Sequence, residues 1–127
     1  MVKRINPPEF PKPASNYSQG IVHAAGAERL ILSGQVGITG DGKPVAGVEA
    51  QMRQAWANFL SVLKTAGFSP ADVVKVTVYV TQPALIEFRR EREKALAGNA
   101  PAATYVQVAG LADPAYLVEI EGEAVKG

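Results

Sequence analysis

The stretch ADVVKVTVYVT, residues 71–81, constrains the fold more than any other part of this sequence. Successive side chains of a strand point to opposite faces of a sheet. One face of this strand carries only valines: Val74, Val76, Val78 and Val80. The other face carries Lys75, Thr77 and Tyr79. The pattern therefore predicts a strand in a sheet that is covered on one face and open on the other.

Amphipathic helices are predicted on both sides of this strand. Apolar residues recur at spacings of three and four over residues 48–66, and Gly67 is suited to follow the end of that helix. Pro83 begins a second helix, which runs to about residue 97 and is stopped by Gly98. Because each helix has one apolar stripe, we expect both to pack on the same face of the sheet.

Further strands are predicted before and after the helices. Two β-prone runs within residues 20–34, separated by a turn at Gly26, predict a hairpin, and the proline-rich stretch 7–13 predicts an extended arm on the surface. The last strands are expected at about residues 103–108 and 116–125. This order predicts one α+β domain over residues 1–127, with two helices on one face of one mixed sheet.

The strand at residues 103–108 has two faces to assign. The more apolar face is expected to meet the core, and it comprises Thr104, Val106 and Val108. The opposite face carries Ala103, Tyr105 and Gln107, a short methyl, a phenol and an amide. We expect this second face to line a pocket or to form plain sheet surface.

The uncovered face of the sheet also has two interpretations. In the last strand, one side carries the carboxylates Glu119, Glu121 and Glu123. Such a surface is compatible with contact with water, as is common for antiparallel sheets. Alternatively, copies of the chain close their open faces around a symmetry axis, which places clefts at the subunit junctions.

Composition narrows the range of functions. The chain has no cysteine and a single histidine, His23, so thiolate sites and paired-histidine metal sites are excluded, and we expect no metal or cofactor. Thirteen basic residues against twelve acidic ones give no support for a nucleic-acid partner. No apolar run approaches the roughly 18 residues that span a bilayer, so we expect a cytoplasmic protein with no membrane partner.

Arginines gather on the second helix. Arg92 falls on the apolar stripe with Leu85 and Phe88, and Arg89 lies beside it. One interpretation is structural, with Arg92 reaching solvent or pairing with a nearby glutamate. The other is that Arg89 or Arg92 holds a substrate carboxylate through two parallel hydrogen bonds. Arg90 falls on the outer side of the helix, where a solvated charge is expected.

Other side chains could act on a substrate. Glu119 and Glu121 share a face at about 6.5 to 7 Å along the strand, a spacing that suits the positioning of a water molecule but also describes ordinary surface carboxylates. Tyr17 and Tyr105 could each offer a hydroxyl, although tyrosines more commonly serve packing. His23 is interpreted as an exposed side chain.

Several stretches together resemble the RidA/YjgF family of reactive-intermediate imine and enamine deaminases. They are SNYSQGIV (15–22), LSGQVG (32–37), ADVVKVTVYVT (71–81), APAATYVQVAGL (100–111) and LVEIEGEAV (117–125). The resemblance covers nearly the whole chain. It implies a chorismate-mutase-like fold, a homotrimer and three pockets for small molecules at the subunit interfaces.

The resemblance also assigns roles residue by residue. Tyr17 matches the family's pocket tyrosine, Gly34 its loop glycine, and Glu119 the glutamate that places the hydrolytic water. The arginine that clamps the substrate carboxylate lies in a PARS stretch of the deaminating members, and here PAAT places Ala103 at that position. Tyr105 replaces a small residue of the same strand.

The resemblance also indicates that this chain has arginines on the second helix where the family has uncharged residues. Arg89 occupies the position of a family asparagine and Arg92 that of an aromatic residue, so either could substitute for the lost arginine. We expect hydrolysis of an atypical imine or enamine, with weak activity on the usual substrates unless this substitution works. The alternatives are a trimer that binds a metabolite or regulates without turnover, and an endoribonuclease, which the charge balance does not favour.

Overall fold

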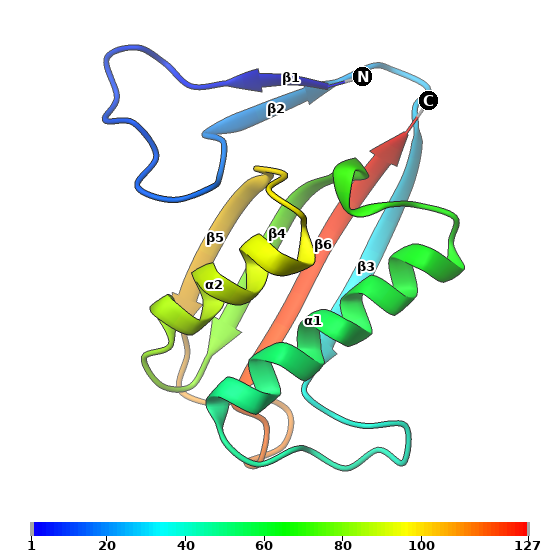
Figure 1. The fold of residues 1–127 in the computed structure, drawn as a ribbon, viewed down its shortest axis with the longest axis vertical. Helices are drawn as coiled ribbons and strands as arrows, with labels where there is room; N and C mark the ends of the chain where they lie inside the picture. Colours follow the sequence, from blue (N-terminus) through cyan, green and yellow to red (C-terminus); the bar gives the residue numbers. More distant parts are fainter. Residues whose placement is uncertain (1, 127) are drawn as a thin grey trace.

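The computed structural model describes residues 2–126, which form two layers and a separate hairpin (Figure 1). The elements in chain order are β1 (Val2–Ile5), β2 (Gly20–His23), β3 (Glu28–Val36), α1 (Val48–Thr65), a 3-10 turn (Pro70–Asp72), β4 (Val73–Val80), α2 (Leu85–Ala95), β5 (Ala102–Gln107) and β6 (Val118–Lys126). No helix within these residues has the length and apolar character needed to cross a bilayer.

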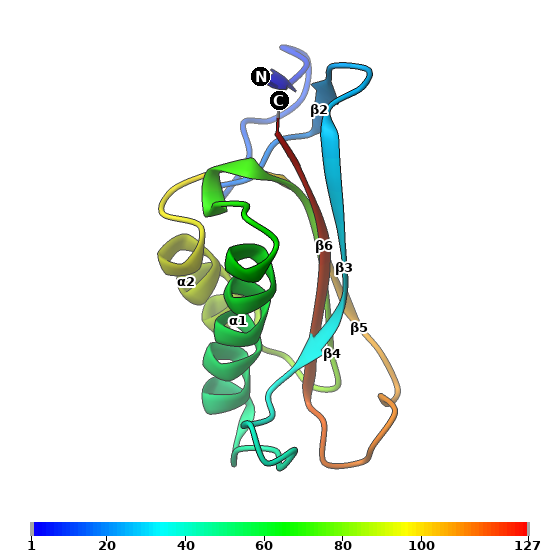
Figure 2. The ribbon, with the colours of Figure 1, turned by 90° about the vertical axis from the view of Figure 1, so that its right-hand side faces the viewer.

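The main sheet has four strands in the order β3-β6-β4-β5. β4 and β5 run parallel, whereas β6 is antiparallel to both of its neighbours, so the sheet is mixed. α1 lies over the β3 end of the sheet and α2 over the β5 end (Figure 1). Figure 2 shows both helices on one face and no element on the other. The predicted α+β fold, with two helices on one face of one mixed sheet, is confirmed.

The core lies between the helices and this sheet face. β4 contributes Val73, Val76, Val78 and Val80, and β6 contributes Val118, Ile120 and Ala124, all of them buried. The helices supply larger side chains to the same cluster: Met52, Trp56, Phe59, Leu63, Phe88 and Leu96. Burial of this apolar surface is the main stabilising term for a fold of this kind. On the opposite sides, Lys75, Thr77 and Tyr79 of β4 and the three glutamates of β6 are half-buried or exposed, as the alternation predicts, whereas Val125 near the end of β6 is buried.

The helix boundaries follow from local backbone chemistry. Gly67 has φ +81 directly after the Ala66 cap of α1, and Gly98 has φ +81 in the turn that follows α2. This left-handed conformation favours glycine, so Gly67 ends α1 as predicted. At α2 the chain already leaves the helix at Ala97, which has φ +50, and Gly98 is the next residue of the turn. α2 begins at Leu85, two residues after Pro83.

The hairpin predicted over residues 20–34 is wrong. β2 pairs antiparallel with β1 in a separate two-stranded sheet, and β3 pairs with β6. A turn does form at Gly26, which has φ +82, but it redirects the chain from one sheet into the other. The reason is that β3 buries Leu32 in the main core, whereas Val22 and His23 of β2 remain exposed. The proline-rich stretch 7–13 lies in the mostly exposed β1–β2 connection.

The faces predicted for β5 are reversed. Ala103 and Tyr105 pack against the core, while Thr104 is exposed and accepts a hydrogen bond from Lys75 Nζ at 2.9 Å. The reason is the parallel register with β4, in which Val78 is paired with Tyr105. Paired residues of neighbouring strands share a face, so Tyr105 joins the buried valine side.

Substitution of Gly122 by alanine should destabilise the fold. A methyl group there would lie 2.5 Å from the carbonyl oxygen of Lys75 and 2.9 Å from the Phe59 ring, and neither neighbour can move easily. We expect Gly122→Ala to lower the free energy of unfolding by about 1–3 kcal/mol, as for other overpacked cores. Urea denaturation at matched protein concentration measures the change. Gly40→Ala is the control, since its methyl group would meet nothing within 4 Å. Equal stability of the two variants would contradict the packing described here.

Candidate functional site

A small cavity of about 100 Å³ lies between α2, β5 and the loop that precedes β2. Its lining residues are Ser15, Tyr17, Leu85, Phe88, Arg89, Arg92, Ala103 and Tyr105. Five of these residues are among the site residues expected from the sequence. The structure therefore brings Tyr17, both candidate arginines, Ala103 and Tyr105 together.

The loop carrying Tyr17 is held in place by hydrogen bonds to the α2–β5 connection. Ser18 donates its backbone N–H to the carbonyl of Pro101 at 3.0 Å and its hydroxyl to the carbonyl of Ala100 at 2.6 Å. Asn16 donates its side-chain amide to the carbonyl of Gly98 at 2.6 Å. Tyr17 lies between these two anchored residues, so its position over the cavity is set by the backbone around it.

Arg92 is buried and has no carboxylate partner. Its side chain is 3% exposed, and within residues 2–126 it forms no ion pair. Nη2 donates to the Ser15 hydroxyl at 3.1 Å, and the guanidinium carbon lies 5.0 Å from the centre of the Phe88 ring. Nε has no partner within the same residues. The expected position on the buried stripe is confirmed, whereas a structural ion pair with a glutamate is not present in this part of the chain.

The surroundings of Arg92 disfavour its charged form. Burial lowers the pKa of Arg92 most, and the positive charge of Arg89 lowers it further. The Glu93 carboxylate acts in the opposite direction, as does Tyr17 to a smaller extent. A buried cation that lacks a counter-charge is costly, so an anion entering the cavity would be stabilised.

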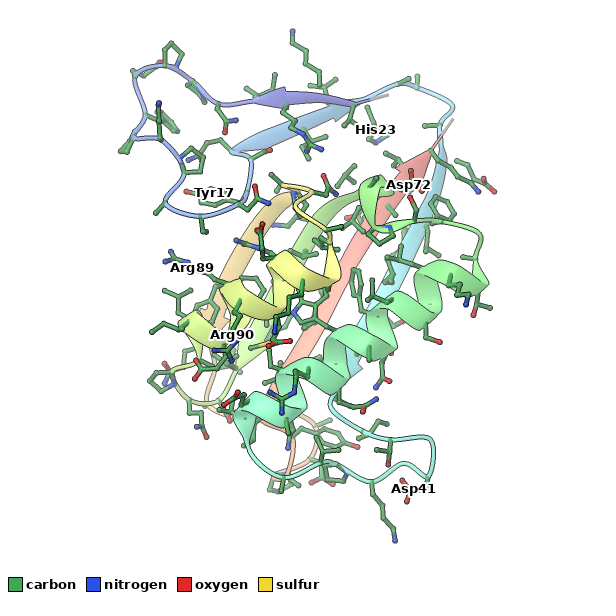
Figure 3. The ribbon with its side chains drawn as sticks, in the orientation of Figure 1. Tyr17, His23, Asp41, Asp72, Arg89 and Arg90 are labelled. Carbon is green, nitrogen blue, oxygen red and sulfur yellow. The ribbon has the colours of Figure 1, made fainter. Side chains whose placement is uncertain are left out.

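Arg89 and Arg90 have different environments, although they are neighbours in sequence. Arg89 lines the cavity and extends toward the side where the loop with Tyr17 lies (Figure 3). Arg90 points elsewhere and pairs with Glu91 at 3.2 Å and with Glu49 of α1 at 3.3 Å. Arg90 therefore connects the two helices, a role that its predicted position on the outer side did not indicate.

Tyr105 closes the cavity from β5 and connects to the start of α2. Its hydroxyl accepts a hydrogen bond from the backbone N–H of Ala84 at 2.8 Å, and its ring lies 5.7 Å from that of Phe88. Ala84 is buried, and α2 has no side-chain cap at this end. Ala103 lies two residues earlier on the same face and contributes only a methyl group.

Glu119 and Gly34 do not line this cavity. Glu119 lies on the open face of the sheet, paired with Val36 of β3 and Tyr79 of β4. Gly34 lies in a bulge of β3, and a methyl group there would approach Glu119 Cδ to 2.6 Å. The absence of a side chain at Gly34 therefore leaves room for the Glu119 carboxylate. This pair forms a second cluster, separated from the cavity by the sheet.

The open face around Glu119 is acidic. Burial raises the pKa of Tyr79 above its ordinary value, and Glu121 and Glu119 add to this shift. His23 is exposed and lies 3.0 Å from the carbonyl of Ala24 through Nδ1. Within residues 2–126, no group of three or more histidine, cysteine or acidic side chains could hold a metal ion.

Three lining residues were not expected to be part of the site. Leu85 and Phe88 were recognised on the same helical stripe as Arg92, but apolar residues on a stripe are normally assigned to the core. Ser15 belongs to the SNYSQGIV stretch, and its proximity to Arg92 depends on a contact between residues 77 positions apart. Sequence spacing carries no signal for such a contact.

The comparisons with known proteins agree with this architecture. A family model described as Endoribonuclease L-PSP matches residues 8–126. A RutC family protein of Pyrococcus horikoshii is 35% identical over 121 residues, which cover 91% of each chain. The crystal structure of YyfB of Yersinia pestis, of the conserved Rid protein family, has a TM-score of 0.88 at 32% identity and covers 98% of each chain. Yeast Mmf1 has a TM-score of 0.71 at 27% identity over the full length of both chains.

The chain belongs to the RidA/YjgF family. The fold seen in Figure 1 is that of the family's solved structures, so the resemblance drawn from the sequence is confirmed. The PAAT stretch of this family member lies at the cavity, with Ala103 in its wall and two helix arginines nearby.

Removal of the Tyr105 hydroxyl should destabilise the protein. Tyr105→Phe leaves the buried N–H of Ala84 without its acceptor, and an unsatisfied buried donor costs about 1–3 kcal/mol. We expect a loss of this size in the free energy of unfolding, measured by urea denaturation. Tyr116→Phe is the matched control, because the Tyr116 hydroxyl makes no hydrogen bond within residues 2–126. A loss in the control equal to that in Tyr105→Phe would argue against the hydrogen bond as the cause.

Proposed function

We propose that this chain forms a homotrimer whose interface pockets bind a small organic anion and hydrolyse its imine or enamine group. The observation that carries the proposal is the buried Arg92 guanidinium, which faces a cavity and has no carboxylate partner among the described residues. Burial of an unpaired charge is unfavourable unless an anion binds there. Membership of a family that includes imine and enamine deaminases supports a carboxylate-bearing substrate.

Assembly of three chains would bring together the cavity and the cluster of Gly34 and Glu119, which lie apart in one chain. The cavity lies at β5, one edge of the sheet, while Gly34 and Glu119 lie toward the other edge on the open face. In a cyclic trimer, each subunit presents one surface to a different surface of its neighbour. Such an interface can place Glu119 of one subunit at the cavity of the next. Ile31 of β3 is an apolar side chain that is 66% exposed in the single chain. Its exposure supports the idea that another subunit covers the open face of the sheet.

The proposed reaction consumes one water molecule for each imine. The oxygen of water adds to the carbon of the C=N bond, the nitrogen gains protons, and cleavage of the C–N bond releases ammonia and a carbonyl compound. An enamine first moves a proton from nitrogen to its terminal carbon and becomes the imine. Glu119 would accept a proton from the attacking water and return it to the nitrogen, as a general base and then a general acid.

The helix arginines would take the role of the family's strand arginine, whose position is occupied by Ala103 in this chain. Loss of a charged, two-bond contact to a carboxylate costs about 1.5–3 kcal/mol, or one to two decades in binding. The guanidinium of Arg92 or Arg89 would restore this contact from the opposite wall of the cavity. The narrow space between these arginines and Tyr105 favours short substrates.

Glu119→Gln should abolish most of the activity. We expect ammonia release from freshly generated 2-iminopropionate to fall by about 10²- to 10⁴-fold, the usual contribution of general acid–base catalysis. Glu121→Gln is the matched control, since Glu121 lies two residues along the same face of β6 and has no role in the reaction. Wild-type rates in the Glu119→Gln variant would refute the proposed mechanism.

A particle of three chains should be present in solution. Light scattering is expected to give about three times the 13.4 kDa mass of one chain. A single-chain particle at assay concentration would contradict the proposal, because the cavity would then have no glutamate beside it.

A non-catalytic binding protein is the second candidate, and the alanine at position 103 favours it. In that case, a small carboxylate raises the melting temperature of the trimer while no ammonia is released from any imine. The two candidates therefore differ in turnover and agree on the anion pocket.

A further inference from the structure

The part of the cavity wall that one chain supplies holds two positive charges and no carboxylate. Arg89 and Arg92 are one helical turn apart on α2, and both line the cavity. Side chains three residues apart lie on the same side of a helix, so the two guanidinium groups repel each other. No lining residue carries a carboxylate. Within residues 2–126 neither arginine forms an ion pair, in contrast to Arg90 on the same helix.

Glu93, the carboxylate that acts on the pKa of Arg92, has another hydrogen-bond partner. Glu93 accepts a hydrogen bond from the side-chain amide of Asn16 at 3.0 Å, and it is not part of the cavity wall. Nε of Arg92 is a buried donor without a partner, and the one side-chain hydrogen bond of Arg92 within residues 2–126 runs from Nη2 to the Ser15 hydroxyl. One carboxylate on Arg92 would satisfy the buried cation and leave the charge of Arg89 unbalanced.

The shape of the cavity limits the length of the ligand. Its volume of about 100 Å³ is well below that of a drug-like pocket, which favours ligands of only a few carbons. Phe88, Leu85 and the ring of Tyr105 supply apolar walls between the charged groups. Arg92 is buried, whereas Arg89 is exposed, so the cavity wall presents one cation shielded from solvent and one open to it.

We propose that the cavity selects short dicarboxylates, with one carboxylate on the buried Arg92 and the second on the exposed Arg89. This inference rests on the proposed function and specifies its substrate class as 2-imino dicarboxylic acids of three or four carbons. Their hydrolysis follows the same balance, in which one imine and one water give one keto dicarboxylate and one ammonia.

Matched pairs of acids test the selectivity. Titration calorimetry at low ionic strength compares malonate with propionate and succinate with butyrate, because the members of each pair have equal carbon numbers. We expect each dicarboxylate to bind about ten- to hundred-fold more tightly than its partner, the gain typical of one added charged hydrogen-bond pair. Arg89→Gln should remove this preference while the monocarboxylates keep their affinity.

Arg90→Gln is the control for a general effect of positive charge on ligand binding. It removes one positive charge from the same helix, but its side chain is paired outside the cavity, so the preference should persist. Near-ultraviolet circular dichroism establishes that each variant keeps its tertiary fold.

The outcomes separate this inference from the function on which it rests. Equal affinities within each pair, or a preference that survives Arg89→Gln, would overturn the dicarboxylate inference, and ammonia release from 2-iminopropionate would still support the hydrolase. Loss of the preference in Arg90→Gln as well would also overturn it, since the effect would then be nonspecific. Absence of both binding and ammonia release would refute the two proposals together.

Discussion

One-sided burial of the four-stranded sheet is the constraint on which the rest of the molecule depends. The valines of β4 and the apolar side chains of β6 can leave water only if both helices lie on that face. α2 is thereby fixed over β5, which is an edge strand with no further neighbour in the main sheet. A cavity opens at this edge because the helix covers the sheet there while Ala103 contributes only a methyl group to the wall.

The polar groups of the site are held by the backbone that surrounds this edge. Asn16 and Ser18 anchor the loop to the α2–β5 connection, and Tyr105 joins β5 to the start of α2. The charged end of Arg92 thus lies between this anchored loop, through Ser15, and the buried Phe88 ring of its own helix. A guanidinium so placed loses little further conformational freedom when it binds an anion, which is the physical basis of preorganisation.

Sequence periodicity predicted the parts of the fold that are set by burial. The alternation assigned the faces of β6 and of most of β4 correctly, although Val73 rather than Val74 joins the core cluster. The three-and-four spacing identified both helices and the buried position of Arg92. β5 was assigned to the wrong face because its residues are small or amphipathic, so hydrophobicity alone did not distinguish its two sides. The register of β5 with β4 determines which side of β5 faces the core, and this register depends on tertiary contacts rather than on local sequence.

The other differences between prediction and structure also arise from long-range contacts. The turn at Gly26 was recognised, but a turn does not specify which strand will pair with the segment that follows it. The placement of Ser15 against Arg92 and of Tyr105 against Ala84 likewise depends on long-range contacts. The resemblance to the family supplied the site residues that periodicity could not, and the structure places five of them at one cavity and two on the open face of the sheet.

The hydrogen bond between Tyr105 and Ala84 also couples the width of the cavity to the stability of the fold. A smaller residue at position 105 would widen the cavity, but it would also leave the buried amide of Ala84 without its acceptor. A substitution that makes room for a larger ligand on this strand therefore also weakens the start of α2, unless a second change supplies another acceptor.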